Sequence, residues 1–306
     1  MSIGRVTTDL NRREFVRTLG GGLAVIAAGA SCAGGDNDAA AAGATVAAED
    51  TVTSTPVAAP VPGLQLYTVR SEMQRDFDGT LARVAEIGYR EVEFAGYFDR
   101  LPAQVKTSLQ AAGLSAPAAH IPLEAFAAEL DRTLDSAAEI GHKYVIVAWV
   151  GNDRRTADGY RRTADEFNTF GEAASTRGLL FGYHNHDFEF APVGDKNGFD
   201  ILLENTDPAH VIFEMDLFWI TKGGKDPLAY FERWPGRFHT VHVKDMDGSP
   251  EGRMVDVGAG VIDFASIFAR AEQAGIRHYF VEHDNPADPM ESVRRSHEAL
   301  SVLLRS

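Results

Sequence analysis

The sequence has 306 residues and a single cysteine, Cys32, so no disulfide can form within one chain and a zinc site built from paired cysteines is excluded. Basic residues are also few: 29 Lys and Arg stand against 44 Asp and Glu, which gives a formal net charge of −15. Such an acidic chain repels the phosphates of nucleic acids and the headgroups of anionic lipids. We therefore expect no nucleic-acid partner, and a neutral or cationic small molecule or a metal ion is favoured.

The N-terminal part lacks an apolar run of the ~20 residues that a membrane span needs. It has instead the adjacent residues Arg12 and Arg13, followed by a shorter apolar stretch from Leu19 to Ala30. A charged start before an apolar run of this length is typical of an export signal, and the paired arginines resemble the twin-arginine type. The sequence predicts that residues 1–32 are a signal peptide and that the mature protein is periplasmic or otherwise extracytoplasmic.

Cys32 stands directly after this apolar run and follows the small residues Ala30 and Ser31. This arrangement resembles the lipid-attachment site of a bacterial lipoprotein, which would tether the protein to a membrane. The alternative is an incidental thiol that is removed with the signal peptide. Residues 33–62 are rich in Ala, Thr and Pro and contain almost no large apolar side chains, so we expect a flexible linker. The folded domain is then residues 63–306.

The remaining chain alternates between short β-rich runs and amphipathic helical stretches. The predicted strands are Gly63–Val69, Glu91–Ala95, Leu114–Ile121, Tyr144–Trp149, Leu179–His186, Val211–Leu217, Phe238–Lys244 and His278–His283. The clearest helical stretches are Asp78–Ile87, Phe126–Ile140, Thr156–Arg177 and Phe264–Ala274. Strands that alternate with helices in this number predict a single (β/α)8 TIM barrel. A doubly wound open sheet is the alternative, but the sequence after the first strand, Tyr67-Thr68-Val69-Arg70, lacks a glycine-rich phosphate loop.

Histidine and carboxylate side chains gather at the ends of the predicted strands, where a barrel carries its chemistry. Buried parallel strands are otherwise apolar on both faces, which makes these polar residues informative. They are His120, His184 to Asp187, Glu214 and Asp216, His242 to Asp245, and Glu282 to Asp284. Any one of them has a simpler explanation as a hydrogen-bonded core histidine or a helix cap. Candidate ligands on four consecutive strands favour a divalent metal site, since imidazole with carboxylate suits Mn, Co, Fe, Ni or Zn.

Several short motifs resemble the xylose isomerase-like barrel superfamily, which includes sugar and sugar-phosphate isomerases and epimerases, inosose dehydratases and endonuclease IV. The motifs are Gly63-Leu64-Gln65-Leu66-Tyr67, Tyr183-His184-Asn185-His186, Met215-Asp216, His242-Val243-Lys244-Asp245 and Val281-Glu282-His283-Asp284. The resemblance extends over residues 63–306. It implies one divalent metal ion, with Mn, Co, Mg and Zn as the candidates, held by a Glu, Asp, His and Glu set from strands five to eight.

Three positions match that ligand set residue by residue: Asp216, His242 and Glu282. At strand five His184 stands where the family has a glutamate, so His184 or the nearby Glu189 is expected to be the fourth ligand. Trp219 stands where the epimerases have a histidine. Two-base epimerisation in the family uses opposed glutamates, and this chain lacks one of them.

The resemblance implies proton transfer next to a carbonyl, assisted by a metal that polarises substrate oxygens. Glu282 is the candidate base, and His186 or His120 is the candidate acid. Lys244 is the candidate to stabilise negative charge on a substrate oxygen. The candidate substrate-binding residues are Trp149, Glu189 and Trp219.

The expected substrate is a small sugar or glycoside without a phosphate, because the protein is predicted to be exported and the site motifs lack an arginine cluster. The sequence favours a metal-dependent sugar isomerase or epimerase. One alternative is a lyase or hydratase that performs β-elimination on an oxidised glycoside. The other is a non-catalytic sugar- or metal-binding lipoprotein. A homo-oligomer is compatible with each of these.

Overall fold

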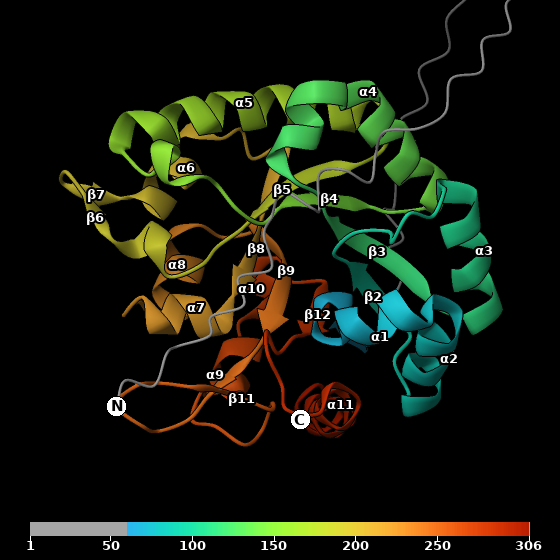
Figure 1. Cartoon of the computed structure of the whole chain (residues 1–306). Coiled ribbons are helices and arrows are strands. Elements are labelled where there is room, and N and C mark those ends of the chain that lie inside the picture. Colours follow the sequence, from blue (N-terminus) through green and yellow to red (C-terminus); the bar gives the residue numbers. More distant parts are fainter. Residues whose placement is uncertain (1–59, 306) are drawn as a thin grey trace, which may run out of the picture. The chain divides into compact units, whose positions relative to one another are not determined.

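The computed structural model describes residues 60–305, which form a closed barrel of eight parallel strands (Figure 1). The barrel strands are β1 (Pro62–Gln65), β2 (Glu91–Phe94), β3 (Ser115–His120), β4 (Tyr144–Val147), β5 (Leu180–His184), β8 (Val211–Asp216), β9 (Phe238–Val243) and β12 (His278–Val281). Each strand pairs with the next barrel strand along the chain, and β12 pairs with β1 to close the sheet. The predicted (β/α)8 barrel is confirmed. The predicted signal peptide, with Cys32, and all but the last residues of the predicted linker lie outside the described residues.

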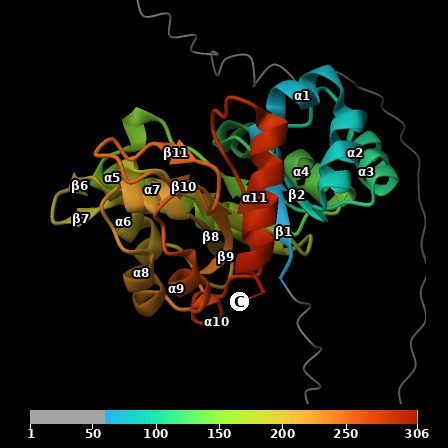
Figure 2. The same ribbon diagram turned by 90° about the horizontal axis from the view of Figure 1, so that it is seen from below.

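Helices surround the barrel, and the view from below shows α11 lying against β1 (Figure 2). The helices are α1 (Arg70–Arg75), α2 (Phe77–Ile87), α3 (Pro102–Ala112), α4 (Leu123–Ile140), α5 (Ala157–Ser175), α6 (Gly198–Asn205), α7 (Leu217–Lys222), α8 (Pro227–Arg233), α9 (Phe264–Phe268), α10 (Ala271–Ala274) and α11 (Pro289–Leu303). Two small hairpins are added, β6 (Pro192–Val193) with β7 (Lys196–Asn197) and β10 (Asp245–Met246) with β11 (Met254–Val255). Within residues 60–305, no helix combines the length and apolar character that crossing a membrane requires.

Every predicted strand extends past the end of the real one, and this changes the position of several side chains. The predicted strand Gly63–Val69 ends at Gln65, because residues 66–69 form a 3-10 helix whose Tyr67 N–H donates to the Gln65 side chain. The strand predicted to reach His186 ends at His184, so His186 lies in the following loop. The predicted helix Phe264–Ala274 is two short helices, α9 and α10.

Apolar side chains fill the half of the barrel interior that lies toward the amino ends of the strands. One packed cluster consists of Ala118, Tyr144, Ile146, Ile212 and Phe280, all of them buried. Gly182 belongs to the same layer, and a Cβ there would lie 2.8 Å from the Cδ1 atom of Ile212. Glycine is needed at this position because the neighbouring side chains already occupy the space. This apolar layer closes the barrel on the side away from the carboxyl ends of the strands.

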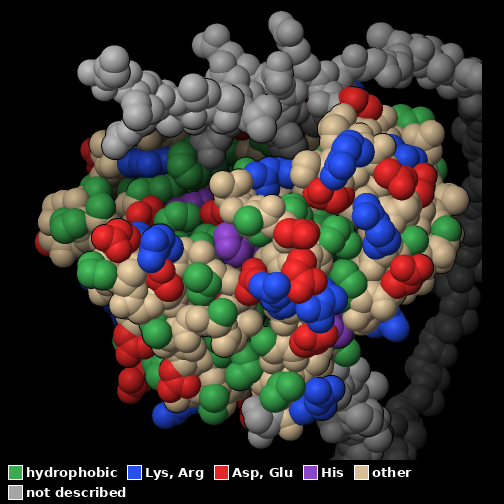
Figure 3. Space-filling model, turned by 60° about the horizontal axis from the view of Figure 1, so that its bottom comes forward, with side chains coloured by type: hydrophobic (Ala, Val, Ile, Leu, Met, Phe, Trp, Pro, Cys, Tyr) green, Lys and Arg blue, Asp and Glu red, His purple; other side chains and the backbone are tan. Residues whose placement is uncertain are grey.

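The outer surface carries charges of both signs. On the face shown in Figure 3, acidic and basic side chains are interspersed, without a continuous basic area among the described residues in view. A nucleic-acid-binding face requires basic residues that are clustered. This face therefore gives no support to a polyanionic partner.

His142 makes the stability of the fold depend on pH. Its Nδ1 atom lies 2.6 Å from the Ala116 carbonyl oxygen and its Nε2 atom 3.0 Å from the Tyr97 hydroxyl. Burial lowers the pKa of His142 from 6.5 to about 4. Below pH 6.5 the unfolded chain therefore binds more protons at His142 than the folded chain does. The unfolding free energy that this group contributes at higher pH is lost as the pH falls from 6.5 toward 4.

We expect His142→Gln to remove this pH dependence. Wild-type protein should lose about 2 kcal/mol of unfolding free energy from this group between about pH 7.5 and about pH 5, and the variant should lose correspondingly less. Urea unfolding of both proteins at the two pH values measures the difference. Equal losses in the two proteins would show that His142 is not buried as a neutral ring.

Candidate metal and catalytic site

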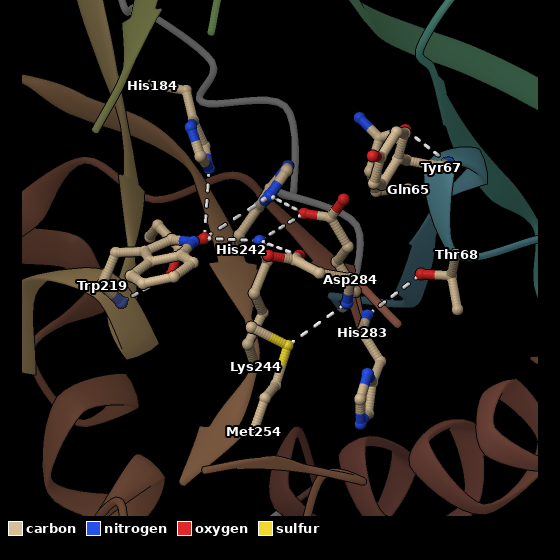
Figure 4. Close-up of polar contacts among 12 residues, drawn as sticks. Gln65, Tyr67, Thr68, His184, Trp219, His242, Lys244, Met254, His283 and Asp284 are labelled. Atoms are coloured by element: carbon tan, nitrogen blue, oxygen red, sulfur yellow. Dashed lines mark hydrogen bonds and ion pairs between the residues drawn. The ribbon is translucent and has the colours of Figure 1, made fainter. Parts of the chain in front are cut away.

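Polar side chains fill the upper half of the barrel interior, at the carboxyl ends of the strands. His184 ends β5 and Asp216 ends β8, while His242 is the penultimate residue of β9. Lys244 and Glu282 come directly after β9 and β12. All five are buried, and His184, His242 and Lys244 point toward one another in Figure 4.

Four of these residues form a group that we call the outer cluster: His184, Asp216, His242 and Glu282. One potential ligand atom from each lies within 4.8 Å of the others. His184 Nε2 lies 3.1 Å from Asp216 Oδ2, and His242 Nδ1 lies 2.8 Å from Glu282 Oε2. These are the four side chains that the sequence names as metal ligands, with His184 as the residue from strand five.

Lys244 neutralises part of the negative charge beside the outer cluster. Its Nζ atom lies 3.0 Å from Asp216 Oδ2, 2.7 Å from Glu282 Oε2 and 2.7 Å from Asp284 Oδ1. Burial lowers the pKa of Lys244, but the three carboxylates outweigh burial and raise the pKa well above its ordinary value. The ammonium group is charged, and each of its three N–H donors has a carboxylate close by.

A second group, which we call the inner cluster, contains Glu93, His120, Glu214 and His242. His120 Nε2 lies 2.6 Å from Glu214 Oε2, and His242 Nε2 lies 2.6 Å from Glu93 Oε2. Gln65 Nε2 donates a hydrogen bond to the same Glu93 oxygen over 2.7 Å. His242 therefore belongs to both clusters.

Sequence reasoning did not identify Glu93 or Gln65 as site residues. A signal was available, because β2 reads Glu91-Val92-Glu93-Phe94 and places an acid in the middle of a buried strand. The sequence predicts Glu214 at a strand end but gives it no catalytic or metal-binding role. Glu93 and Glu214 belong to the inner cluster, and Gln65 donates a hydrogen bond to Glu93.

Burial and neighbouring charges shift the pKa values of His242 and Glu282 away from those of free side chains. Burial lowers the pKa of His242, but the nearby carboxylates of Glu214, Glu282 and Glu93 outweigh it and raise the pKa well above 6.5. For Glu282 burial raises the pKa, but Lys244 and His242 outweigh it and hold the pKa well below the ordinary range. Glu282 is therefore a carboxylate at neutral pH.

The donor set fits a divalent cation. Two imidazole nitrogens and two carboxylate oxygens suit Zn, Mn, Co, Fe or Ni. His242 Nδ1 is buried and close to Glu282, yet makes no hydrogen bond of acceptable geometry. Carboxylates also outnumber the cationic side chains across the two clusters and their neighbours Lys244 and Asp284. When all of these carboxylates are ionised, negative charge remains in excess even with His120 and His242 protonated, and a cation between Asp216 and Glu282 would balance it.

Glu189 lies away from the outer cluster. Its Oε1 atom accepts a hydrogen bond from the Tyr183 hydroxyl over 2.5 Å, and its Oε2 atom accepts one from the His186 backbone N–H over 2.8 Å. Tyr183 packs against Phe167 of α5, on the helix side of β5. Burial raises the pKa of Glu189 to about 7. In this structure Glu189 holds the loop after β5, and His184 alone of the two candidate fourth ligands lies beside Asp216.

The candidate acids differ in protonation. Burial lowers the pKa of His120, but Glu93 and Glu214 outweigh it and raise the pKa above 6.5. Burial, with the neighbouring His184 ring and the Lys244 ammonium, lowers the pKa of His186 well below 6.5. His120 is thus the better proton donor, while His186 is a neutral ring.

Aromatic rings surround His186 at the upper end of the barrel. The His186 ring centroid lies 5.1 Å from that of Trp149 and 5.6 Å from those of Phe188 and Trp219. The Arg155 guanidinium lies 3.3 Å from the Phe188 ring centroid and 4.4 Å from that of Trp149. Phe188 and Arg155 were not expected from the sequence; Phe188 begins a short 3-10 helix after β5, and Arg155 follows one after β4.

Asp245, next to Lys244, has a structural role. Its Oδ2 atom accepts hydrogen bonds from the backbone N–H groups of Gly258 and Gly260, and its Oδ1 atom accepts those of Met246 and Ile262. One buried carboxylate thus fixes the loop that follows β11. This explains the aspartate in the His242-Val243-Lys244-Asp245 motif without a role in metal binding.

Comparison with known proteins agrees with this architecture. Residues 81–303 match the sequence model of the xylose isomerase-like TIM barrel family. The chain belongs to this family. The resemblance expected from the sequence is confirmed at this level, while the twin-arginine signal stays a prediction.

Several proteins whose names indicate a function are similar to the chain. An inosose dehydratase from Geobacillus thermodenitrificans is 24% identical over 242 residues, which cover 67% of this chain and 80% of that protein. An inosose dehydratase from Lacticaseibacillus casei is 23% identical over 65% of this chain and 78% of its own length. The crystal structure of a sugar phosphate isomerase/epimerase from Parabacteroides distasonis is 28% identical, with a TM-score of 0.68, and covers 83% of this chain and 98% of that one. The comparisons support an enzyme, and support a dehydratase as well as an isomerase or epimerase.

Proposed function

We propose that this protein is a divalent-metal-dependent enzyme that moves a proton next to a carbonyl group of a non-phosphorylated sugar or keto-sugar. The observation that carries the proposal is the outer cluster, in which ligand atoms of His184, Asp216, His242 and Glu282 lie within 4.8 Å of one another. A divalent ion held by these residues would polarise carbonyl and hydroxyl oxygens and so acidify the adjacent C–H bond. Mn, Co, Zn and Mg are the candidates, with Mg less favoured by two nitrogen ligands.

Glu282 is the proposed base, because Lys244 and His242 keep its carboxylate ionised and ready to accept a proton. The same contacts make it a weak base while Lys244 stays 2.7 Å away. A substrate oxygen that attracts the Lys244 ammonium would weaken this contact and raise the basicity of Glu282. Lys244 would then stabilise negative charge that develops on that oxygen.

His120 is the proposed acid. The carboxylates of the inner cluster favour its protonated form, and its side chain is 14% exposed. His186, as a neutral ring among aromatic neighbours, is better suited to accept a hydrogen bond from a substrate hydroxyl.

The site favours a neutral ring over a phosphate. Lys244 is surrounded by carboxylates, and those carboxylates would repel a phosphate group. Trp149 and Trp219 both lie beside His186 and are the proposed rings on which a sugar can stack. An extracytoplasmic location, supported by Arg12 and Arg13, and a membrane tether through Cys32 belong to the same proposal and rest on the sequence.

β-Elimination is the second candidate reaction. It begins with the same proton removal, but a β-oxygen substituent leaves instead of a proton returning to the neighbouring carbon. The inosose dehydratases among the relatives favour it. His184 stands where the family has a second glutamate, and this also favours elimination. Elimination removes a proton from one carbon only and therefore needs one base there.

Solvent exchange tests the proposal directly. Full-length protein loaded separately with Mn, Co or Zn is incubated in D2O with free sugars, keto-sugars and 3-oxidised glycosides, and the products are examined by NMR. We expect deuterium at the carbon next to the carbonyl in an isomerase or epimerase product, or an unsaturated product from elimination. Activity on phosphorylated sugars alone would overturn the substrate class. Bound metal without exchange on any sugar would favour a binding protein.

A further inference from the structure

We infer that Glu93 and Glu214 are positioning residues for His242: they accept the ring proton at Nε2 and so leave Nδ1 free to bind the cation. This inference rests on the metal site of the proposed function. It gives a role to two buried carboxylates that touch neither the open end of the barrel nor the other proposed ligands.

The geometry divides the His242 ring between the two clusters. On one side Nδ1 lies 2.8 Å from Glu282 Oε2 and 3.9 Å from Asp216 Oδ2. On the other side Nε2 lies 2.6 Å from Glu93 Oε2 and 3.1 Å from Glu214 Oε2. A ring nitrogen that binds a metal carries no proton, so the proton of the neutral ring must sit on the other nitrogen and needs an acceptor there.

The opposite tautomer is unfavourable in this setting. A proton on Nδ1 would point into the outer cluster and exclude the cation. The unprotonated Nε2 would then face two carboxylate oxygens within 3.1 Å, in a fully buried environment that cannot supply water as a donor. Electrostatic repulsion between lone pairs opposes this arrangement, so the inner carboxylates select the tautomer that binds metal.

The two carboxylates are themselves held in place. Glu93 Oε2 accepts a hydrogen bond from Gln65, and Glu214 Oε2 lies 2.6 Å from His120 Nε2. Glu93 and Glu214 belong to β2 and β8, and both are 0% exposed. Groups on barrel strands hold a ligand more accurately than groups on loops.

A second metal ion in the inner cluster is the competing explanation, since four potential ligands meet there as well. Such an ion would need His242 to bind metal through both nitrogens, which requires loss of both ring protons. The N–O distances of 2.6 Å at His120 and His242 are short, as expected where imidazole N–H groups donate to carboxylates. Hydrogen bonding therefore explains the inner cluster with ordinary protonation states.

The chain offers a matched control on the same strand and face. Glu91 precedes Glu93 by two residues and also pairs with a histidine, since Glu91 Oε2 lies 2.7 Å from His278 Nδ1. His278 is the first residue of β12, so this pair lies at the opposite end of the barrel from His242. Glu91→Gln removes one carboxylate from a Glu–His pair without touching either cluster.

The experiment compares wild-type protein with Glu93→Gln, Glu214→Gln, their double variant and Glu91→Gln. Calorimetric titration with Zn²⁺ and with Co²⁺ gives affinity and stoichiometry, and circular dichroism checks folding. We expect one ion per wild-type chain, affinity reduced by about 10- to 100-fold in each inner variant and further in the double variant, and no change for Glu91→Gln. In zinc-loaded wild-type protein labelled with 15N-histidine, the NMR signals of His242 should show a protonated Nε2 and an unprotonated Nδ1.

The outcomes of the titration distinguish the positioning role, a second metal ion and the absence of a metal site. Metal binding by wild-type protein with unchanged affinity in both inner variants would overturn the positioning role and leave the proposed metal site intact. Two ions per chain would overturn it in favour of a second metal. Absence of metal binding by the wild-type protein would overturn the proposed site and this inference together. Where a variant fails to fold, the NMR measurement on wild-type protein tests the inference without it.

Discussion

Asp216→Asn is expected to remove the bound metal ion and the activity that depends on it. Asp216 has two roles, because Oδ2 faces the outer cluster while Oδ1 accepts a hydrogen bond from the Trp219 N–H and caps α7. Asparagine keeps the side-chain oxygen that caps the helix and removes the negative charge that attracts the cation. The variant should therefore fold and fail to bind metal tightly.

Metal content and melting temperature measure this effect. A metal at about 1,000 times its Kd stabilises the native state by about 4 kcal/mol, and this stabilisation should disappear in Asp216→Asn. Asp226→Asn is the matched control, because Asp226 caps α8 by accepting from the Leu228 N–H and lies outside both clusters. Equal metal content in wild-type protein and Asp216→Asn would contradict the proposed ligand set.

Glu282→Gln is expected to lower the rate of proton exchange by about 10²- to 10⁴-fold, which is the contribution of a well-placed general base. The amide cannot accept the substrate proton, although its oxygen still faces His242 and can bind metal weakly. Glu282→Ala removes that oxygen as well. Metal content should fall less in Glu282→Gln than in Glu282→Ala, while exchange is lost in both.

Deuterium incorporation and metal content, measured on the same preparations, separate the two roles of Glu282. Glu298→Gln on α11 is the control, since that side chain is 65% exposed and pairs with Arg294 on the surface. It should leave both quantities unchanged. A Glu282→Gln enzyme that exchanges deuterium at the wild-type rate would exclude Glu282 as the base and direct attention to His186.

The barrel and the outer cluster could be predicted because they follow from local sequence. Alternating strands and helices specify a barrel, and the carboxyl ends of its strands must meet at one end. His184, Asp216, His242 and Glu282 each stand at or next to such an end, so the fold alone brings them together. The loop position of His186 could not be predicted, because His184-Asn185-His186 contains no proline or glycine that marks the end of β5.

The inner cluster could not be predicted for a different reason. The strand pairing is irregular between Glu91 and Glu93 on β2, and between Phe213 and Glu214 on β8. Such irregularities re-aim side chains by shifting one strand against its neighbour. Which residues of β2 and β8 reach His242 depends on these shifts, and a single sequence does not reveal them.

The apolar layer beneath the site means that substrate and product can reach the outer cluster only from the carboxyl ends of the strands. Ala118, Tyr144, Ile146, Ile212 and Phe280 are buried and packed together across the interior. A molecule bound at the outer cluster cannot continue downward through this layer, so it must leave by the path along which it came. Product must therefore depart toward the carboxyl ends of the strands before the next substrate enters.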